Sequence, residues 1–241
     1  MERVFVMLTE RYRNEWKYLC SRQMQVQLYE RLRQAFEPDE HAGPEGSYTV
    51  HSLYFDDHQN SCAWDNEAGA EPRVKYRIRC YGSDFSALHL ERKEKNNRKC
   101  RKISCPISRD EYQGLTAGNT EEVFWQAKEP LIRRFCASAM MRGFSPKLSL
   151  DYERTALVDP TLNIRITFDS EISAAAAVHG YPITPDQPQF PLLSNMDCVL
   201  EVKFDDILPG WLHRMISSVP VQQIPFSKYY LGMKKIKEVY R

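Results

Sequence analysis

The feature that most constrains the fold is the alternation of two kinds of side chain in the stretch RVKYRIRCY, residues 73–81. Cations stand at every second position, namely Arg73, Lys75, Arg77 and Arg79. Apolar and aromatic residues stand between them. A period of two predicts a β-strand, because successive side chains leave opposite faces of the pleat. One face of this strand is therefore apolar, and the other carries a row of cations roughly 7 Å apart.

Most of the other predicted strands repeat this pattern, with one apolar face and one face of Arg, Lys and Glu. The segment RITFD, for example, puts Arg165 and Asp169 on one face and Ile166 and Phe168 on the other. The expected strands cover residues 13–20, 48–56, 73–81, 86–95, 98–107, 146–157, 162–172 and 199–204. The expected helices cover residues 21–36, 108–114, two segments within 121–141 that Pro130 separates, 211–217 and 228–239. No linker or repeat divides the chain, so we predict a single α+β domain over residues 1–241, built on antiparallel strands.

A charged strand face has an ordinary explanation, because antiparallel sheets commonly expose one side to water. That explanation suits any one of these strands, but it weakens for the whole set, in which Lys and Arg dominate. Like charges opposite one another on neighbouring strands destabilise a sheet, so we expect an anion to offset them. If the sheet closes into a barrel of about eight strands, the charged faces line an interior with room for a small ligand. Guanidinium and ammonium groups in such a lumen favour a polyphosphate.

Three glutamates share the charged faces, namely Glu15, Glu91 and Glu201. Carboxylates alone would repel phosphate. They are consistent with a hard divalent cation, which proteins hold through one or two carboxylates together with substrate phosphates. The residues by themselves therefore predict a metal-assisted site for an oligophosphate.

Composition argues against several other classes of protein. The net charge is only +1, unlike that of a protein that coats nucleic acid non-specifically. An RNA-binding sheet is also disfavoured, because Tyr76 and Ile78 lie on the face opposite the cations. The seven cysteines form no CxxC pair, so we expect neither a disulfide framework nor a zinc site. No segment is long and apolar enough to span a membrane, and the expected location is cytoplasmic.

Ordered segments across residues 13–232 resemble the polyphosphate polymerase domain of the vacuolar transporter chaperone (VTC) family. They read RNEWKYL, YTVHSLYFD, RVKYRIRCY, LERKEKNNRKCRK, LSLDYERTAL, NIRITFD, LEVKF and FSKYYLG. VTC domains belong to the triphosphate tunnel metalloenzyme superfamily, which also includes triphosphatases and a class of adenylate cyclase. The resemblance implies a closed antiparallel eight-stranded β tunnel with helices packed outside. It also implies ATP, pyrophosphate and polyphosphate as binding partners, with no nucleic acid expected.

The same resemblance implies roles for individual residues. The basic residues that would grip the triphosphate are Lys17, Arg77, Arg79, Lys93, Arg154, Arg165 and Lys228. Glu201 resembles the main carboxylate ligand of Mn²⁺ or Mg²⁺, and Glu15 resembles an assisting ligand. Further candidates for the phosphate-binding wall are Lys75, Lys99, Arg101 and Lys203. The register of residues 98–107 is not determined by the sequence, so which cations of that strand face the phosphate stays open.

The chain departs from the superfamily pattern at two places. The superfamily carries ExExK on its first strand, whereas this chain has Arg13, Glu15 and Lys17, which resembles the VTC branch more than the hydrolases. Pro225 stands where a further basic residue is expected. The implied activity is transfer of the γ-phosphate of ATP to pyrophosphate or to a growing polyphosphate chain. Two alternatives stay open: a triphosphatase of the same fold, and a non-catalytic module that binds polyphosphate or inositol phosphates.

Overall fold

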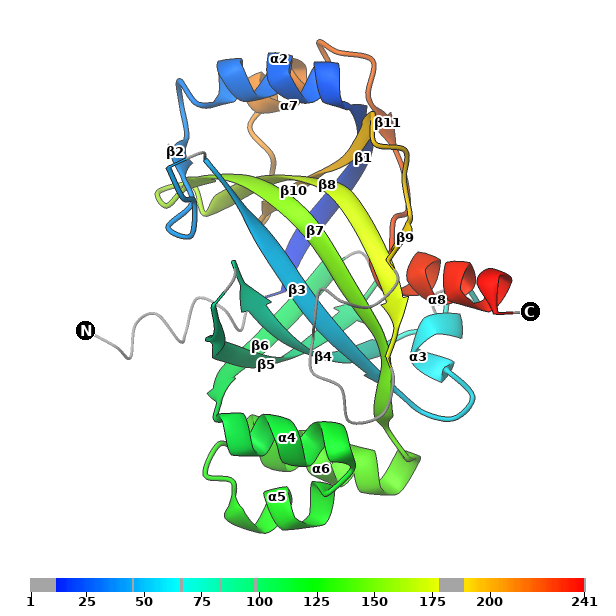
Figure 1. Ribbon diagram of the computed structural model, residues 1–241. Helices are drawn as coiled ribbons and strands as arrows, with labels where there is room; N and C mark the ends of the chain where they lie inside the picture. Colours follow the sequence, from blue (N-terminus) through cyan, green and yellow to red (C-terminus); the bar gives the residue numbers. More distant parts are fainter. Residues whose placement is uncertain are drawn as a thin grey trace.

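Eight long strands form a closed antiparallel barrel in the computed structural model, which describes residues 12–44, 46–65, 67–82, 84–97, 99–177 and 189–240 (Figure 1). The barrel strands are β1 (Arg13–Ser21), β3 (Ser47–Asp56), β4 (Arg73–Tyr81), β5 (Asp84–Asn96), β6 (Lys99–Ile107), β7 (Ser145–Asp159), β8 (Ile164–Ala176) and β10 (Asp197–Phe204). Their order is β7-β3-β4-β5-β6-β1-β10-β8, and β8 pairs with β7 to close the barrel. The predicted closed antiparallel tunnel is therefore confirmed. Two-residue strands at its edges are β2 (Glu37–Pro38), β9 (Phe190–Pro191) and β11 (Gln222–Gln223).

Helices pack on the outside of this barrel (Figure 1). They are α2 (Arg22–Leu32), α3 (Ser61–Trp64), α4 (Arg109–Ala117), α5 (Thr120–Gln126), α6 (Pro130–Arg142), α7 (Gly210–Ile216) and α8 (Lys228–Val239). Ser108 caps α4 through a capping box with Glu111, and Pro130 opens α6, which confirms the predicted break. α2 ends at Leu32, so it is shorter than the helix predicted to reach Phe36. Among the helices that the structure describes, none has the length and apolar character needed to cross a bilayer.

The outward faces of the strands pack against helices in two separate cores. Phe135 of α6 packs edge-on against Phe55 of β3 and Tyr76 of β4, with ring centroids 4.9 and 5.1 Å apart. On the other side, Leu28 of α2 and Leu212 of α7 are fully buried against β1, β8 and β10. Burial of each large apolar side chain contributes about 1.5–3 kcal/mol. Because the apolar faces pack outward, the charged faces line the lumen.

The two ends of the barrel differ. β2 and the start of β3 lie at one end, and α8 lies at the other (Figure 1). Tyr229 of α8 stacks on Tyr54 with ring centroids 4.8 Å apart, and its hydroxyl donates to Asp56 at 2.8 Å. Gly232 allows α8 to approach β7 closely, because a Cβ at this position would lie 2.5 Å from Leu148. α8 therefore packs against the end of the barrel.

The strand pair β1–β6 is short. It pairs Arg13 with Cys100 and Asn14 with Lys99. Further along β1, β11 lies beside the strand, and the Ile224 amide donates to a β1 carbonyl at 2.9 Å. This arrangement brings residues 224–228 alongside the lumen.

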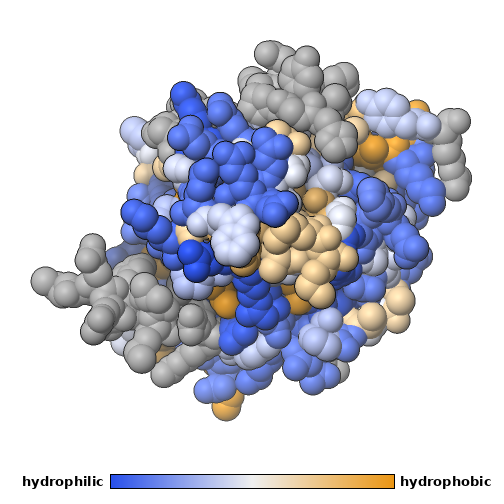
Figure 2. All heavy atoms as spheres, turned by 90° about the horizontal axis from the view of Figure 1, so that it is seen from below, coloured by the Kyte–Doolittle hydropathy of each residue, from blue (hydrophilic) through white to orange (hydrophobic). Residues whose placement is uncertain are grey.

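The face over α4–α6 is mostly hydrophilic, with an apolar patch near its centre (Figure 2). The exposed large hydrophobic residues of α5 and α6 are Trp125, Met140 and Met141. They lie on the helices and not on the barrel strands, so they do not line the lumen.

Candidate functional site

Cross-strand pairing places the predicted site residues on one interior surface. Directly paired residues of an antiparallel sheet share a face. Along β1–β10, Lys17 pairs with Glu201, and Glu15 pairs with Lys203. The fold thus brings together charges that lie nearly two hundred residues apart in the sequence.

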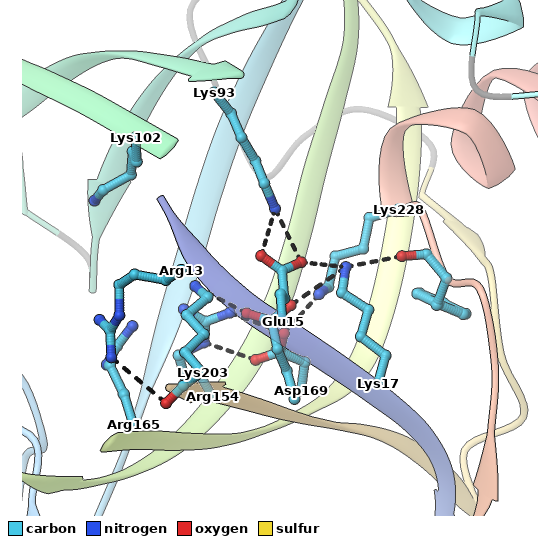
Figure 3. Close-up of polar contacts among 12 residues, drawn as sticks. Arg13, Glu15, Lys17, Lys93, Lys102, Arg154, Arg165, Asp169, Lys203 and Lys228 are labelled. Atoms are coloured by element: carbon cyan, nitrogen blue, oxygen red, sulfur yellow. Dashed lines mark hydrogen bonds and ion pairs between the residues drawn. The ribbon is translucent and has the colours of Figure 1, made fainter. Parts of the chain in front are cut away.

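Glu15 and Glu201 meet three lysines from three strands, and we call these five residues the Glu15–Glu201 cluster. Figure 3 labels Glu15 and the three lysines. The Nζ atom of Lys17 lies 3.0 Å from a Glu15 oxygen and 3.3 Å from a Glu201 oxygen. Lys93 donates to both carboxylate oxygens of Glu15, at 2.9 and 2.8 Å. Lys203 lies 2.9 Å from Glu201. Three ammonium groups therefore surround two carboxylates.

Opposite charges in this cluster stabilise the charged forms of Glu15 and Lys17. Burial and the neighbouring Glu201 act to raise the pKa of Glu15, but the three ammonium groups outweigh them and lower it. Burial acts to lower the pKa of Lys17, but the two carboxylates outweigh it and raise that pKa. Burial lowers the pKa of Lys203 to about 8, although Glu201 opposes the shift. The two carboxylates and Lys17 are thus charged at neutral pH.

A second cluster surrounds Glu91, whose side chain is 2% exposed. Arg77 donates to it from Nε at 2.7 Å, and Lys102 donates at 2.9 Å. The Nη1 atom of Arg79 lies 3.8 Å from the same carboxylate. Burial acts to raise the pKa of Glu91, but these cations outweigh it and hold the pKa well below its usual value. Because a guanidinium has five N–H donors, the arginines can bind a further anion while Glu91 holds them.

A third cluster surrounds Asp169, which is completely buried. It accepts two hydrogen bonds from Arg154, at 2.7 and 2.8 Å, and one from Lys228 at 2.6 Å (Figure 3). Tyr152 lies beside these cations, and its hydroxyl accepts a hydrogen bond from Arg79 at 3.0 Å. Burial acts to raise the pKa of Tyr152, but Arg154 and Arg79 outweigh it and lower the pKa to about 8.

Two further cations lie toward opposite ends of the lumen. Arg165, on the side of β2, donates from Nε to Asp39 at 2.9 Å and from Nη2 to the Tyr48 hydroxyl at 2.9 Å. Lys75, on the side of α8, donates to the Ser227 hydroxyl at 3.0 Å.

Lys75 differs from the other lumenal cations. Within the part of the chain that the structure describes, no carboxylate contacts it. Burial lowers its pKa to about 7, and the positive charges of Lys93, Lys17 and Arg73 add to the shift. Lys75 is therefore the lumenal residue whose charge depends most on an incoming anion.

A family model described as the VTC domain matches residues 12–237. The chain belongs to the VTC domain family. Family membership indicates a function related to triphosphate or polyphosphate.

One similar solved structure supports the fold of this VTC domain. A proposed adenylate cyclase from Bacillus halodurans is 12% identical, with a TM-score of 0.54 over 91% of this chain and 95% of the other. The PH1819 protein from Pyrococcus horikoshii is 13% identical, with a TM-score of 0.47 over 93% of this chain and 98% of the other. At 12% identity, the likeness to the Bacillus halodurans protein shows the fold alone. A search of curated proteins gives no match.

Two of the predicted phosphate-binding residues of the VTC domain lie outside the lumen. Arg101 pairs with Glu94 on the outer face and lies 3.4 Å from its carboxylate. Lys99 shares that face, and its side chain is 49% exposed. Lys102, which pairs with Lys93, is the cation that β6 directs inward. The prediction that Lys99 and Arg101 line the lumen is therefore wrong. Neighbouring residues of a strand face opposite sides, so the lumenal cation is Lys102, one position from Arg101.

All the other predicted site residues of the VTC domain lie on the lumenal surface. Sequence reasoning did not select the groups that hold them in place, namely Asp39, Tyr48, Lys102, Tyr152 and Asp169. The alternation that places Arg165 on the charged face of its strand places Asp169 on the same face, so the sequence pattern could have identified Asp169. Asp39 lies in the loop after β2, where no periodic pattern points to it.

The donor set of the Glu15–Glu201 cluster fits a hard divalent cation. The described residues contain no metal-binding group of three or more His, Cys, Asp or Glu side chains. A metal ion in this cluster would therefore have two carboxylates as its protein ligands. Mg²⁺ is commonly bound through one or two carboxylates, with waters and substrate phosphates as its other ligands. Glu15 and Glu201 supply such carboxylates, and lysines neutralise them here.

Proposed function

We propose that this VTC domain is a metal-dependent polyphosphate polymerase that transfers the γ-phosphate of ATP to pyrophosphate or to a growing polyphosphate chain. The observation that carries the proposal is the lumen, where cations from most strands of the barrel converge around a few buried carboxylates. A chain of phosphates offers regularly spaced oxygens to such a surface, whereas a compact anion would meet only one cluster.

The arginines supply positioning and charge stabilisation. Glu91 holds Arg77, and Asp169 holds Arg154, so the directions of their donors are fixed before a substrate arrives. Phosphoryl transfer depends mainly on positioning and on neutralising the transferred group, and preorganised donors do both without reorganisation. Loss of Arg77 or Arg79 is therefore expected to cripple turnover.

Glu201, assisted by Glu15, would hold Mn²⁺ or Mg²⁺ through its carboxylate oxygens. When bound, the cation supplies positive charge that neutralises phosphate oxygens. The lysines of the Glu15–Glu201 cluster would then be available to donate hydrogen bonds to the phosphates.

The ion pairs leave the lumenal carboxylates poorly suited to activate water for attack. Attack by water benefits from a general base, which works best with a pKa near the working pH. Nearby cations instead hold the pKa values of Glu15, Glu91, Asp169 and Glu201 below their usual range. A terminal phosphate is already anionic at neutral pH, so it can attack without such a base.

Product analysis tests the proposal. Purified protein is incubated with ATP, Mn²⁺ and a trace of pyrophosphate, and the products are separated on a gel stained for polyphosphate while orthophosphate is assayed in parallel. We expect a ladder of polymer, and we expect Glu201→Gln to abolish it. Orthophosphate without polymer would instead identify a triphosphatase, and tight binding without turnover would identify a binding module.

A further inference from the structure

Three aromatic rings, His41, Tyr48 and Tyr81, form a shelf at the end of the barrel away from α8. The His41 ring stacks on the Tyr81 ring, with centroids 4.5 Å apart and planes inclined by 18°. Tyr48 packs edge-on against His41 at 5.8 Å and against Tyr81 at 5.7 Å. We call these three residues the aromatic shelf. The phosphate-binding roles proposed above do not account for its stacked rings.

The two tyrosine rings of the shelf are buried or partly buried, whereas the His41 ring is exposed to solvent. Tyr48 is 7% exposed, and Tyr81 is partly buried. The His41 side chain, by contrast, is 41% exposed. Packing therefore fixes two of the rings, and the third presents exposed ring surface to solvent. Proteins bind nucleobases by stacking them on such rings.

The shelf is also joined to the phosphate-binding side of the lumen. The Arg79 guanidinium lies 5.8 Å from the centroid of the Tyr81 ring. Arg165 donates to the Tyr48 hydroxyl and to Asp39.

Asp39 connects the aromatic shelf directly to a phosphate-binding arginine. Its Oδ1 atom accepts a hydrogen bond from the His41 amide at 3.1 Å, while its Oδ2 atom holds Arg165. One carboxylate thus fixes both a phosphate-binding arginine and the loop that carries the exposed ring. A ligand with a planar base at one end and phosphates at the other matches this arrangement.

We propose that the aromatic shelf is the nucleobase subsite of the donor nucleotide. The base stacks on the exposed face of His41, and its triphosphate extends past Arg79 and Arg165 into the lumen. This inference rests on the proposed function, because it requires a nucleoside triphosphate as the donor. It adds that the nucleotide enters from the end of the barrel near β2, with its γ-phosphate directed away from that end.

Calorimetry with two ligands tests the subsite. The ligands are an ATP analogue with an imido bridge between its β- and γ-phosphates, which is not turned over, and inorganic tripolyphosphate, which has no base. We expect His41→Ala to weaken binding of the analogue by about fivefold or more, the lower end of measured base-stacking effects. Tripolyphosphate binding should stay unchanged, and His41→Tyr should restore binding of the analogue. Trp125→Ala, which removes an exposed aromatic ring from α5, is the matched control and should change neither affinity.

Three outcomes would overturn the inference. An equal loss for both ligands would mean that His41 only supports Arg165 through the Asp39 loop. Unchanged binding of both ligands by His41→Ala would also overturn it, while the proposed function would stand because tripolyphosphate still binds. If the unmodified protein binds neither ligand, the proposed function itself fails, and the subsite fails with it.

Discussion

Arg154 and Asp169 form a two-hydrogen-bond ion pair across β7 and β8, the strands that close the barrel. The Arg154 side chain is 4% exposed, and the Asp169 side chain is fully buried. Lys228 of α8 donates to the same carboxylate. Two residues predicted as phosphate ligands are therefore also partners of a buried carboxylate at the closure of the barrel, so their loss will affect stability as well as binding.

Replacing Arg154 by alanine should destabilise the fold strongly. The substitution leaves Asp169 buried with Lys228 as its remaining cation, and removing one partner of a buried ion pair costs about 3–5 kcal/mol. Urea denaturation would measure the change in the free energy of unfolding. Arg154→Lys, which keeps the charge but cannot form both hydrogen bonds, should cost less. A loss below about 1 kcal/mol for Arg154→Ala, as is usual for exposed pairs, would contradict this interpretation.

The neighbours Lys102 and Arg101 provide a test of the register of β6. Lys102→Ala removes a lumenal ammonium group and should weaken tripolyphosphate binding about tenfold, the worth of one hydrogen bond to a charged group. Arg101→Ala removes a cation from the outer face and should leave the affinity unchanged. Calorimetry on both variants measures the difference. If Arg101→Ala has the larger effect, the strand runs in the other register.

Replacing Glu91 by glutamine should make the stability of the protein depend on a bound anion. Without the carboxylate, Arg77, Arg79 and Lys102 repel one another in a buried site, so we expect a lower melting temperature. Tripolyphosphate should raise the melting temperature of this variant more than that of the unmodified protein, because it replaces the missing negative charge. Glu94→Gln, on the outer face of the same strand, is the control. Equal increments in both variants would show that Glu91 and the ligand do not share these cations.

The pKa of Lys75 predicts a pH dependence of stability. Its pKa is about 7 in the folded protein and roughly 10.4 in an unfolded chain, so between these values the unfolded state binds more protons. Stability from this group therefore rises with pH from about 7 to about 10.4, and its destabilising effect is complete below pH 7. Lys75→Met should remove this contribution. The stability of the unmodified protein relative to the variant should thus improve between pH 6.5 and pH 9.5, as measured by urea denaturation. A difference that does not change with pH would refute the shift.

Local alternation predicts much of this structure. For most strands, a period of two is enough to separate an apolar face from a charged face, which is why Arg77, Lys93 and Glu201 are found in the lumen as expected. The break at Pro130 follows in the same way from one residue's backbone chemistry.

What the sequence does not determine is how elements meet. The register of β6 depends on its pairing with β5, and the sequence pattern of residues 98–107 carries cations at both odd and even positions, so Lys102 could not be separated from Arg101. Asp39 acquires its role only because a loop reaches Arg165 across the fold. Such contacts come from tertiary packing, for which short segments carry no periodic signal.

The fate of the γ-phosphate of ATP distinguishes a polymerase from a hydrolase. The protein is given ATP labelled with ³²P at the γ position, together with Mn²⁺ and unlabelled pyrophosphate, and the label is followed into polymer, orthophosphate and unreacted ATP. We predict that most of the transferred label enters chains longer than triphosphate and that Arg77→Ala abolishes the transfer. Label that passes only into orthophosphate would contradict the polymerase and assign the same lumen to hydrolysis.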